Sequence, residues 1–212
     1  MMNLAHFETL RSKINARLNQ IGTRHAHRQI REFPWLYGAL GQVPSKVMFI
    51  CENPSLTGVE RADSRTILGE KAGIEDQWAG GPSSNCIKRF RPALCQLNLK
   101  TTAPTALGGW HCYITNVIKE ADIVRDFSER NKKQLAVEWA DVLAWELQQV
   151  SPTTIFTVGG AADGFVKLLQ SLGHLPGSPV PHKIMHYSNR GPGVTDVYVK
   201  EAIVREIAAH LP

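Results

Sequence analysis

Polar residues lie at or near the ends of three apolar, strand-like runs, and their side chains could do chemistry together. Glu52 and Asn53 directly follow the run KVMFIC, Asn116 lies toward the end of CYITNVI, and His186 lies in HKIMHY. A carboxylate can accept a proton, an amide can orient water or a ligand, and an imidazole can donate a hydrogen bond. These groups suit acid–base chemistry and recognition of a bound ligand, if the fold brings them together.

The pattern of strands and helices would place these residues at one edge of a sheet. Strand-like runs cover residues 46–51, 112–118, 153–158 and 182–187. Helical spacing of apolar residues covers residues 4–21, 85–97 on either side of Pro92, 130–150, a stretch after Gly159 and Gly160, and about 197–209. In the parallel sheet that this alternation predicts, a ligand lies outside the carboxyl ends of the strands.

We therefore expect an α/β fold: a three-layer α/β/α sandwich with a short, mainly parallel four-stranded sheet. A chain of 212 residues fits one domain over residues 1–212, with a helical extension over about residues 1–40. The long irregular stretch 55–84 is rich in glycine, serine and charge, which is typical of a functional or partly disordered segment.

Composition permits a polyanionic partner and argues against a membrane. There are 24 lysines and arginines against 19 acidic residues, a formal charge of +5. No apolar run approaches the roughly 18–20 residues of a membrane span. The charged N-terminal segment MMNLAHFETLRSK does not resemble an export signal. We expect a cytoplasmic monomer, associated with the nucleoid if its source is bacterial.

Several common chemistries lack their motifs. The sequence has no G-x-x-x-x-G-K-[ST] phosphate loop and no G-x-S-x-G hydrolase elbow. The glycines at 159, 160 and 164 do not have dinucleotide-binding spacing and predict a tight strand-to-helix turn. The four cysteines include no C-x-x-C pair, so we expect reduced thiols, no metal and no cofactor. The cysteines are Cys51, Cys86, Cys95 and Cys112.

Three motifs, in order, resemble those of the uracil-DNA glycosylase superfamily over about residues 46–190. They are Cys51-Glu52-Asn53-Pro54, the segment ITNVIK starting at Ile114, and His186-Tyr187-Ser188. The segment SRTILG starting at Ser64 is similar to an arginine-containing segment of the family's thermophile-type branch.

The chain also departs from the family pattern. Cys51 replaces a glycine, Tyr187 replaces a proline, and Ile67 or Leu68 replaces a base-stacking phenylalanine. No cysteine precedes Cys51, so the iron–sulfur cluster of the thermophile-type branch is not expected.

The resemblance implies a metal-independent, monofunctional DNA glycosylase that removes uracil or another deaminated base from DNA. On the matching positions, Asn53 would hold the attacking water and Glu52 could act as the base. His186 would donate to uracil O2, and Asn116 would read N3–H and O4. Each of these residues also has a plain alternative: a turn at Asn53-Pro54, a core or surface histidine, and a strand-end cap at Asn116.

DNA contacts are expected from two further segments. Ser188, Asn189 and Arg190 start a glycine-rich loop that could enter the groove left by a flipped base. A basic cluster at residues 88–91 could contact phosphate, with Phe90 or Trp78 stacking on the base; a helix with a solvated face and a buried Phe90 is the alternative.

Two rival functions stay open. The departures at Cys51, Ile67 and Tyr187 favour a catalytically weak or inactive DNA-binding member of the superfamily. The other rival is an unrelated α/β hydrolase or nucleotide-binding protein, which the missing motifs argue against.

Overall fold

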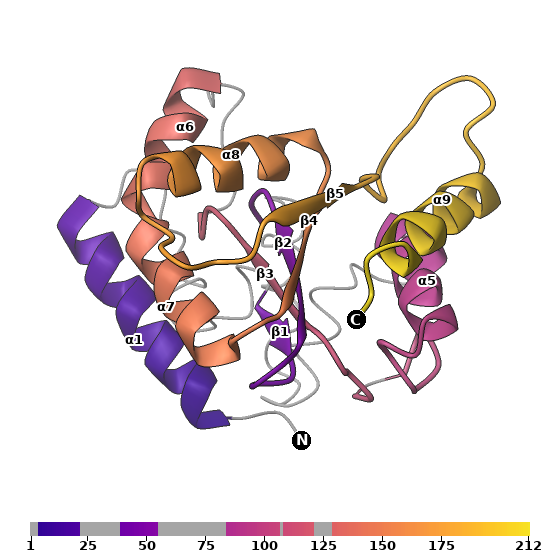
Figure 1. The fold of residues 1–212 in the computed structure, drawn as a ribbon, viewed down its shortest axis with the longest axis horizontal. Helices are drawn as coiled ribbons and strands as arrows, with labels where there is room; N and C mark the ends of the chain where they lie inside the picture. Colours follow the sequence, from indigo (N-terminus) through magenta and orange to yellow (C-terminus); the bar gives the residue numbers. More distant parts are fainter. Residues whose placement is uncertain (1–3, 22–38, 55–83, 107, 121–128) are drawn as a thin grey trace.

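The computed structural model describes residues 4–21, 39–54, 84–106, 108–120 and 129–212 (Figure 1). Trp78 and the segment 64–69 lie outside the described residues, as does much of the expected N-terminal extension. The described elements, in chain order, are α1 (Leu4–Ile21), β1 (Leu40–Gly41), β2 (Val47–Cys51), the π-helix η3 (Cys86–Phe90), α5 (Arg91–Gln96), β3 (Tyr113–Asn116), α6 (Glu129–Glu138), α7 (Ala140–Val150), β4 (Thr154–Val158), α8 (Gly160–Ser171), β5 (Pro181–Ile184) and α9 (Asp196–Ala208).

The strands form one sheet in the order β1-β3-β2-β4-β5. Strands β3, β2, β4 and β5 are parallel to their neighbours, and β1 pairs antiparallel with β3. The predicted α/β fold with a short, mainly parallel sheet is confirmed. The predicted sheet had four strands; β1 is a fifth, whose two residues are too short for a periodic pattern to reveal.

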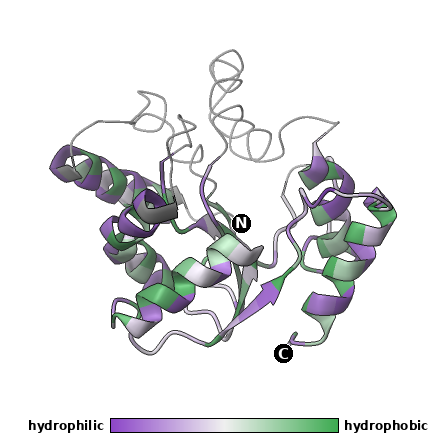
Figure 2. Ribbon diagram, turned by 90° about the horizontal axis from the view of Figure 1, so that it is seen from above, coloured by the Kyte–Doolittle hydropathy of each residue, from purple (hydrophilic) through white to green (hydrophobic). Residues whose placement is uncertain are grey.

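Helices cover both faces of the sheet, which makes three layers. In Figure 1, α1, α6, α7 and α8 lie on one side of the strands, and α5 and α9 lie on the other. Alternate residues of β2 face the two sides: Met48 and Ile50 join the first core cluster, and Phe49 and Cys51 the second. Figure 2 shows that hydrophobic and hydrophilic residues are interspersed along the helices, as expected of helices with one face on a core.

The N-terminal helix belongs to the central core. Leu10, Ile14 and Leu18 of α1 are buried in the cluster that includes α7. The expected helix over 130–150 is divided into α6 and α7 at Trp139, a fully buried residue whose Nε1 donates to Glu120 at 2.9 Å. Within the described ranges, no helix has the length and apolar character of a membrane span.

Near the carboxyl edge of the sheet, the backbone differs from the expected strands and helices at two places. Strand β5 ends at Ile184, earlier than expected, and the N–H of the next residue, Met185, donates to Glu206 of α9 at 2.5 Å. His186 therefore lies in a loop. Before Pro92, which has no N–H to donate, the N–H of Arg91 bonds to Cys86 O five residues back, and the chain makes the wide turn of η3.

Candidate functional site

The first two predicted motifs lie side by side at the carboxyl edge of the sheet. Cys51 at the end of β2 is the register partner of Asn116 at the end of β3. The contact continues beyond the strands, because Val117 N donates to Cys51 O at 2.9 Å and Ile118 N donates to Glu52 O at 3.0 Å. The loop that carries Glu52 is thereby held against the residues that follow Asn116.

Asn116 is buried, with 4% of its surface exposed, and a lysine holds its backbone. Lys119 Nζ donates to the carbonyl of Asn116 and to Thr115 Oγ1, both at 2.6 Å, and forms an ion pair with Glu146 of α7. Burial lowers the pKa of Lys119, and the Glu146 carboxylate opposes that effect. Lys119 is part of the ITNVIK motif, but its buried partner is not apparent from the sequence.

Glu52 and Asn53 lie partly exposed beyond the end of β2. The Glu52 carboxylate pairs with Lys132 of α6 at 2.7 Å. Asn53 Nδ2 donates to the carbonyl of Pro54 at 3.0 Å, and its amide oxygen accepts no hydrogen bond from the described residues. This oxygen is suited to accept a hydrogen bond from water, while the Glu52 carboxylate could accept a proton.

His186 has a defined tautomer. The backbone N–H of Ser188 donates to Nδ1 of the ring at 3.0 Å, so the neutral imidazole carries its proton on Nε2. No described residue forms a hydrogen bond with Nε2, which leaves this donor for a ligand. Burial lowers the pKa of His186, and the nearby Glu52 carboxylate opposes the effect. The lowered pKa favours the neutral ring. Glu52, just beyond the end of β2, interacts electrostatically with the His186 ring.

Gly159 makes room for the His186 ring. It follows β4, the strand between β2 and β5, and has a φ of +88°. A Cβ at this position would lie 3.1 Å from the Cβ and Cδ2 of His186. The tight turn predicted at Gly159 and Gly160 is confirmed, and its glycine also allows this close approach.

An open pocket of about 530 Å³ contains His186 and the start of the loop that follows it. Its polar lining consists mainly of His186, Ser188, Asn189, Arg190, Lys183 and Glu206. Three of the predicted DNA-contacting residues therefore share a pocket with the predicted donor. Asn53 and Asn116 lie at the same edge of the sheet but are not among the residues that line this pocket.

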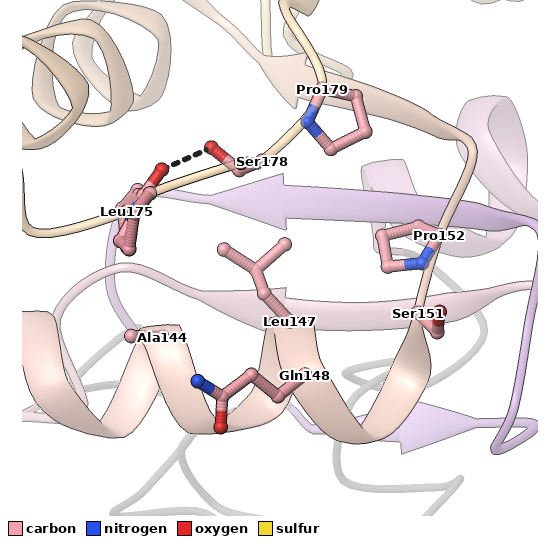
Figure 3. Close-up of a pocket in the computed structure, with 10 residues that line it drawn as sticks. Ala144, Leu147, Gln148, Ser151, Pro152, Leu175, Ser178 and Pro179 are labelled. Atoms are coloured by element: carbon pink, nitrogen blue, oxygen red, sulfur yellow. Dashed lines mark hydrogen bonds between the residues drawn. The ribbon is translucent and has the colours of Figure 1, made fainter.

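A second, smaller pocket lies at the opposite edge of the sheet (Figure 3). It has a volume of about 180 Å³ and lies among α7, the chain before β4 and the chain before β5. Proline, leucine and small polar side chains line it, and Ser178 Oγ donates to the carbonyl of Leu175 at 2.8 Å. It has no charged side chain in its lining and is not part of the candidate site.

A series of ring contacts runs from His186 into the hydrophobic core. Phe90 is fully buried, and its ring centroid lies 5.4 Å from that of Phe49 and 5.5 Å from that of Tyr187. Tyr187 in turn stacks on His186 at 4.5 Å. Phe90 has no exposed face on which a base could stack, so the alternative of a buried phenylalanine describes this arrangement.

The basic cluster around Phe90 is largely internal. Arg91 is 1% exposed and donates to the carbonyl of Pro104 at 3.0 Å. Arg89 is 8% exposed and pairs with Asp196 of α9. The expectation of a solvated or phosphate-contacting face is therefore wrong for these two arginines, because both side chains are buried and donate to acceptors within the protein. Lys88 is exposed.

The cysteines near the site stay protonated as thiols at neutral pH. Cys51 and Cys86 are buried, and burial raises the pKa of each thiol to about 12. Across the described ranges, histidine, cysteine, aspartate and glutamate form no group of three that could hold a metal ion.

Neither a model of a known protein family nor a curated protein sequence matches this chain. The functional interpretation consequently depends on the three motifs and on the geometry at the carboxyl edge of the sheet. Of that geometry, the hydrogen bonding of His186 is the most specific feature.

Proposed function

We propose that the chain is a monofunctional, metal-independent DNA glycosylase that hydrolyses the N-glycosidic bond of uracil or another deaminated base during base excision repair. The observation that carries the proposal is the hydrogen bond from Ser188 N–H to His186 Nδ1, which directs the ring proton to Nε2, a nitrogen with no hydrogen-bond partner among the described residues. The protein would then act on DNA in the cytoplasm, or in the nucleoid of a bacterium.

His186 would stabilise the departing base. Breaking the bond between N1 of uracil and C1′ of the sugar leaves negative charge on the base and positive charge on the sugar. A neutral imidazole that donates from Nε2 to uracil O2 stabilises the developing anion without first giving up its proton. A fixed donor of this kind contributes about 3–4 kcal/mol to lowering a barrier.

Asn53 and Glu52 would act on the water molecule that attacks the sugar. The amide oxygen of Asn53 can orient a water molecule toward C1′, and the Glu52 carboxylate can accept its proton. Lys132 pairs with Glu52 and holds the carboxylate on the α6 side of the loop. The proton passes from water to Glu52 as the new C–O bond forms. Because water is the nucleophile, no lysine Schiff base is required.

Asn116 would select the base after it is flipped out of the helix. The amide can accept from N3–H and donate to O4 of uracil, a pattern that thymine shares and cytosine does not. Its burial favours this role, because hydrogen bonds are most discriminating where water cannot replace them. The exposed residues Asn189 and Arg190 would contact the DNA backbone beside the His186 pocket.

A second candidate is a DNA-binding protein with little or no excision activity. Cys51 supports it, because this buried side chain lies beside Asn116 where the resembled motif has a glycine. A side chain there reduces the space available to a flipped base.

An excision panel distinguishes the two candidates. Purified protein is incubated with oligonucleotides containing uracil, hypoxanthine, xanthine or a thymine mismatch, and alkali then reveals abasic sites. The glycosylase proposal predicts strand breaks with at least one lesion. Binding in a gel-shift assay without breaks at any lesion favours the second candidate and contradicts the first.

A further inference from the structure

Arg89 connects three separate parts of the site. Its Nε donates to Asp196 Oδ1 at 2.6 Å, at the start of α9. Its NH1 donates to two carbonyls of the loop after β5, those of Tyr187 at 3.1 Å and Asn189 at 2.8 Å. These two carbonyls flank Ser188, and Asn189 N donates back to His186 O at 2.9 Å. One guanidinium from η3 therefore holds the turn that begins at His186.

The contact with Tyr187 has a direct consequence for the histidine ring. The carbonyl of Tyr187 and the N–H of Ser188 belong to the same planar peptide group, and in a trans peptide they point in opposite directions. Arg89 binds the oxygen end of this group, and His186 Nδ1 accepts from the N–H end at 3.0 Å. A cation on the carbonyl also polarises the N–H and strengthens its donation.

We propose that Arg89 is a positioning residue which, through the Tyr187–Ser188 peptide, holds His186 in the tautomer with its proton on Nε2. The inference rests on the proposed glycosylase function for its catalytic meaning, but the tautomer itself can be measured without any substrate. Arg89 touches no reacting atom. It acts by fixing the direction of one backbone N–H.

Other charges also surround His186 and must be separated from this effect. Glu52 faces it from the end of β2, and Lys183, Arg190 and Glu206 line the same pocket. Removing any positive charge nearby favours protonation of the ring through space. A through-space effect of that kind depends on the charge at position 89 and not on its hydrogen bonds, so a variant that keeps the charge separates the two.

The test is ¹⁵N NMR of histidine-labelled protein, with the His186 signals assigned by their loss in His186→Gln. Arg89→Met removes the hydrogen bonds. Arg89→Lys keeps the charge but cannot hold two carbonyls and a carboxylate in the same planar fork. Lys88→Met is the matched control, because it removes an exposed positive charge from the neighbouring residue. Thermal melting establishes that each variant is folded.

In the parent and in Lys88→Met, the neutral His186 ring should be protonated at Nε2. In Arg89→Met it should populate both tautomers, and kcat for base release should fall by about 10–100-fold with little change in KM. Arg89→Lys should show a smaller loss of the Nε2 tautomer, and it carries the test if Arg89→Met does not fold.

A folded Arg89 variant that keeps the Nε2 tautomer unchanged would overturn the inference. Absence of base release by the parent protein, with the tautomer shift still observed, would instead contradict the proposed function and leave the role of Arg89 supported.

Discussion

The ammonium group of Lys119 and the carboxylate of Glu146 form an ion pair in which both side chains are completely buried. Glu146 also accepts hydrogen bonds from Tyr113 and Thr115, each at 2.7 Å. Lys119 donates to the backbone of Asn116 at 2.6 Å. The network joins α7 to the end of β3, and so holds the backbone of the residue proposed to read the base.

Removing one partner of this pair should destabilise the protein strongly. Lys119→Met leaves the Glu146 carboxylate buried without its cation, which should lower the free energy of unfolding by about 3–5 kcal/mol. The double variant Lys119→Met, Glu146→Leu should recover much of that loss. Urea denaturation measures each value, and Lys200→Met, at a partly exposed pair, should change it by less than about 1 kcal/mol. Equal effects at the two lysines would contradict the burial argument.

His6 should make the protein less stable in acid. Its Nε2 lies 3.1 Å from Tyr113 Oη, and burial lowers its pKa, with Glu146 opposing. Because the folded pKa lies below the unfolded value of about 6.5, the unfolded chain binds a proton first as the pH falls. Stability is therefore lost as the pH falls below about 6.5.

The matched variant for this effect is His6→Gln, which should lose less stability than the parent between pH 7.5 and pH 5.5. Urea denaturation at the two pH values measures the difference. His182 and His186 also have lowered pKa values but are present in both proteins, so they cancel. Equal losses in the two proteins would show that His6 does not contribute.

Asn116→Asp should reverse the selectivity of the base pocket. An ionised carboxylate presents only acceptors and repels uracil O4, so uracil release should be lost. A protonated carboxyl can donate to cytosine N3 and accept from its amino group, so a trace of cytosine release should appear and rise at lower pH. Asn116→Ala should slow uracil release by roughly 10–100-fold for each unpaired base group.

Release of each base from matched oligonucleotides measures these changes. Uracil release by Asn116→Asp at the parent rate would show that Asn116 is a strand-end cap.

Glu52→Gln tests whether this carboxylate accepts the proton of water. Loss of a general base should reduce kcat by about 10²–10⁴-fold. Lys132→Met is the control, because it removes the partner of Glu52 but leaves the carboxylate. Its kcat should fall much less than that of Glu52→Gln under single-turnover conditions. If Glu52→Gln released the base at the parent rate, Glu52 would not be the general base, and orientation of water by Asn53 would be sufficient for the reaction.

Strands β2, β3 and β4 were predictable because each lies in a short run rich in apolar and β-branched residues, as in VMFIC before Glu52. Short or irregular features carry no such pattern. Two-residue β1 is one example, and another is the break at Trp139, where apolar spacing continues across the boundary. The contact that follows β5 is a third example, because Met185 N–H donates to Glu206 of α9, 21 positions further along the chain.

The sequence placed Asn116 correctly at the end of a strand, whereas His186 was expected within a strand and lies in the loop after β5. Arg89 was interpreted as a surface residue because arginine is usually solvated, whereas its partner Asp196 lies 107 residues further along the chain. Lys119 was hidden in the same way, since its partner Glu146 comes from α7. Sequence spacing identifies groups that could react, but long-range polar contacts that hold them become apparent only in the fold.

The central claim is tested most directly by release of free uracil from a uracil-containing oligonucleotide, with purified protein in excess and the product identified by mass spectrometry. The parent should release uracil and leave an intact abasic strand that breaks only in alkali. His186→Ala should release it about 10²–10³-fold more slowly, while Lys200→Met, at the partly exposed pair on α9, should match the parent. No uracil release by the folded parent, or release by His186→Ala at the parent rate, would contradict the account.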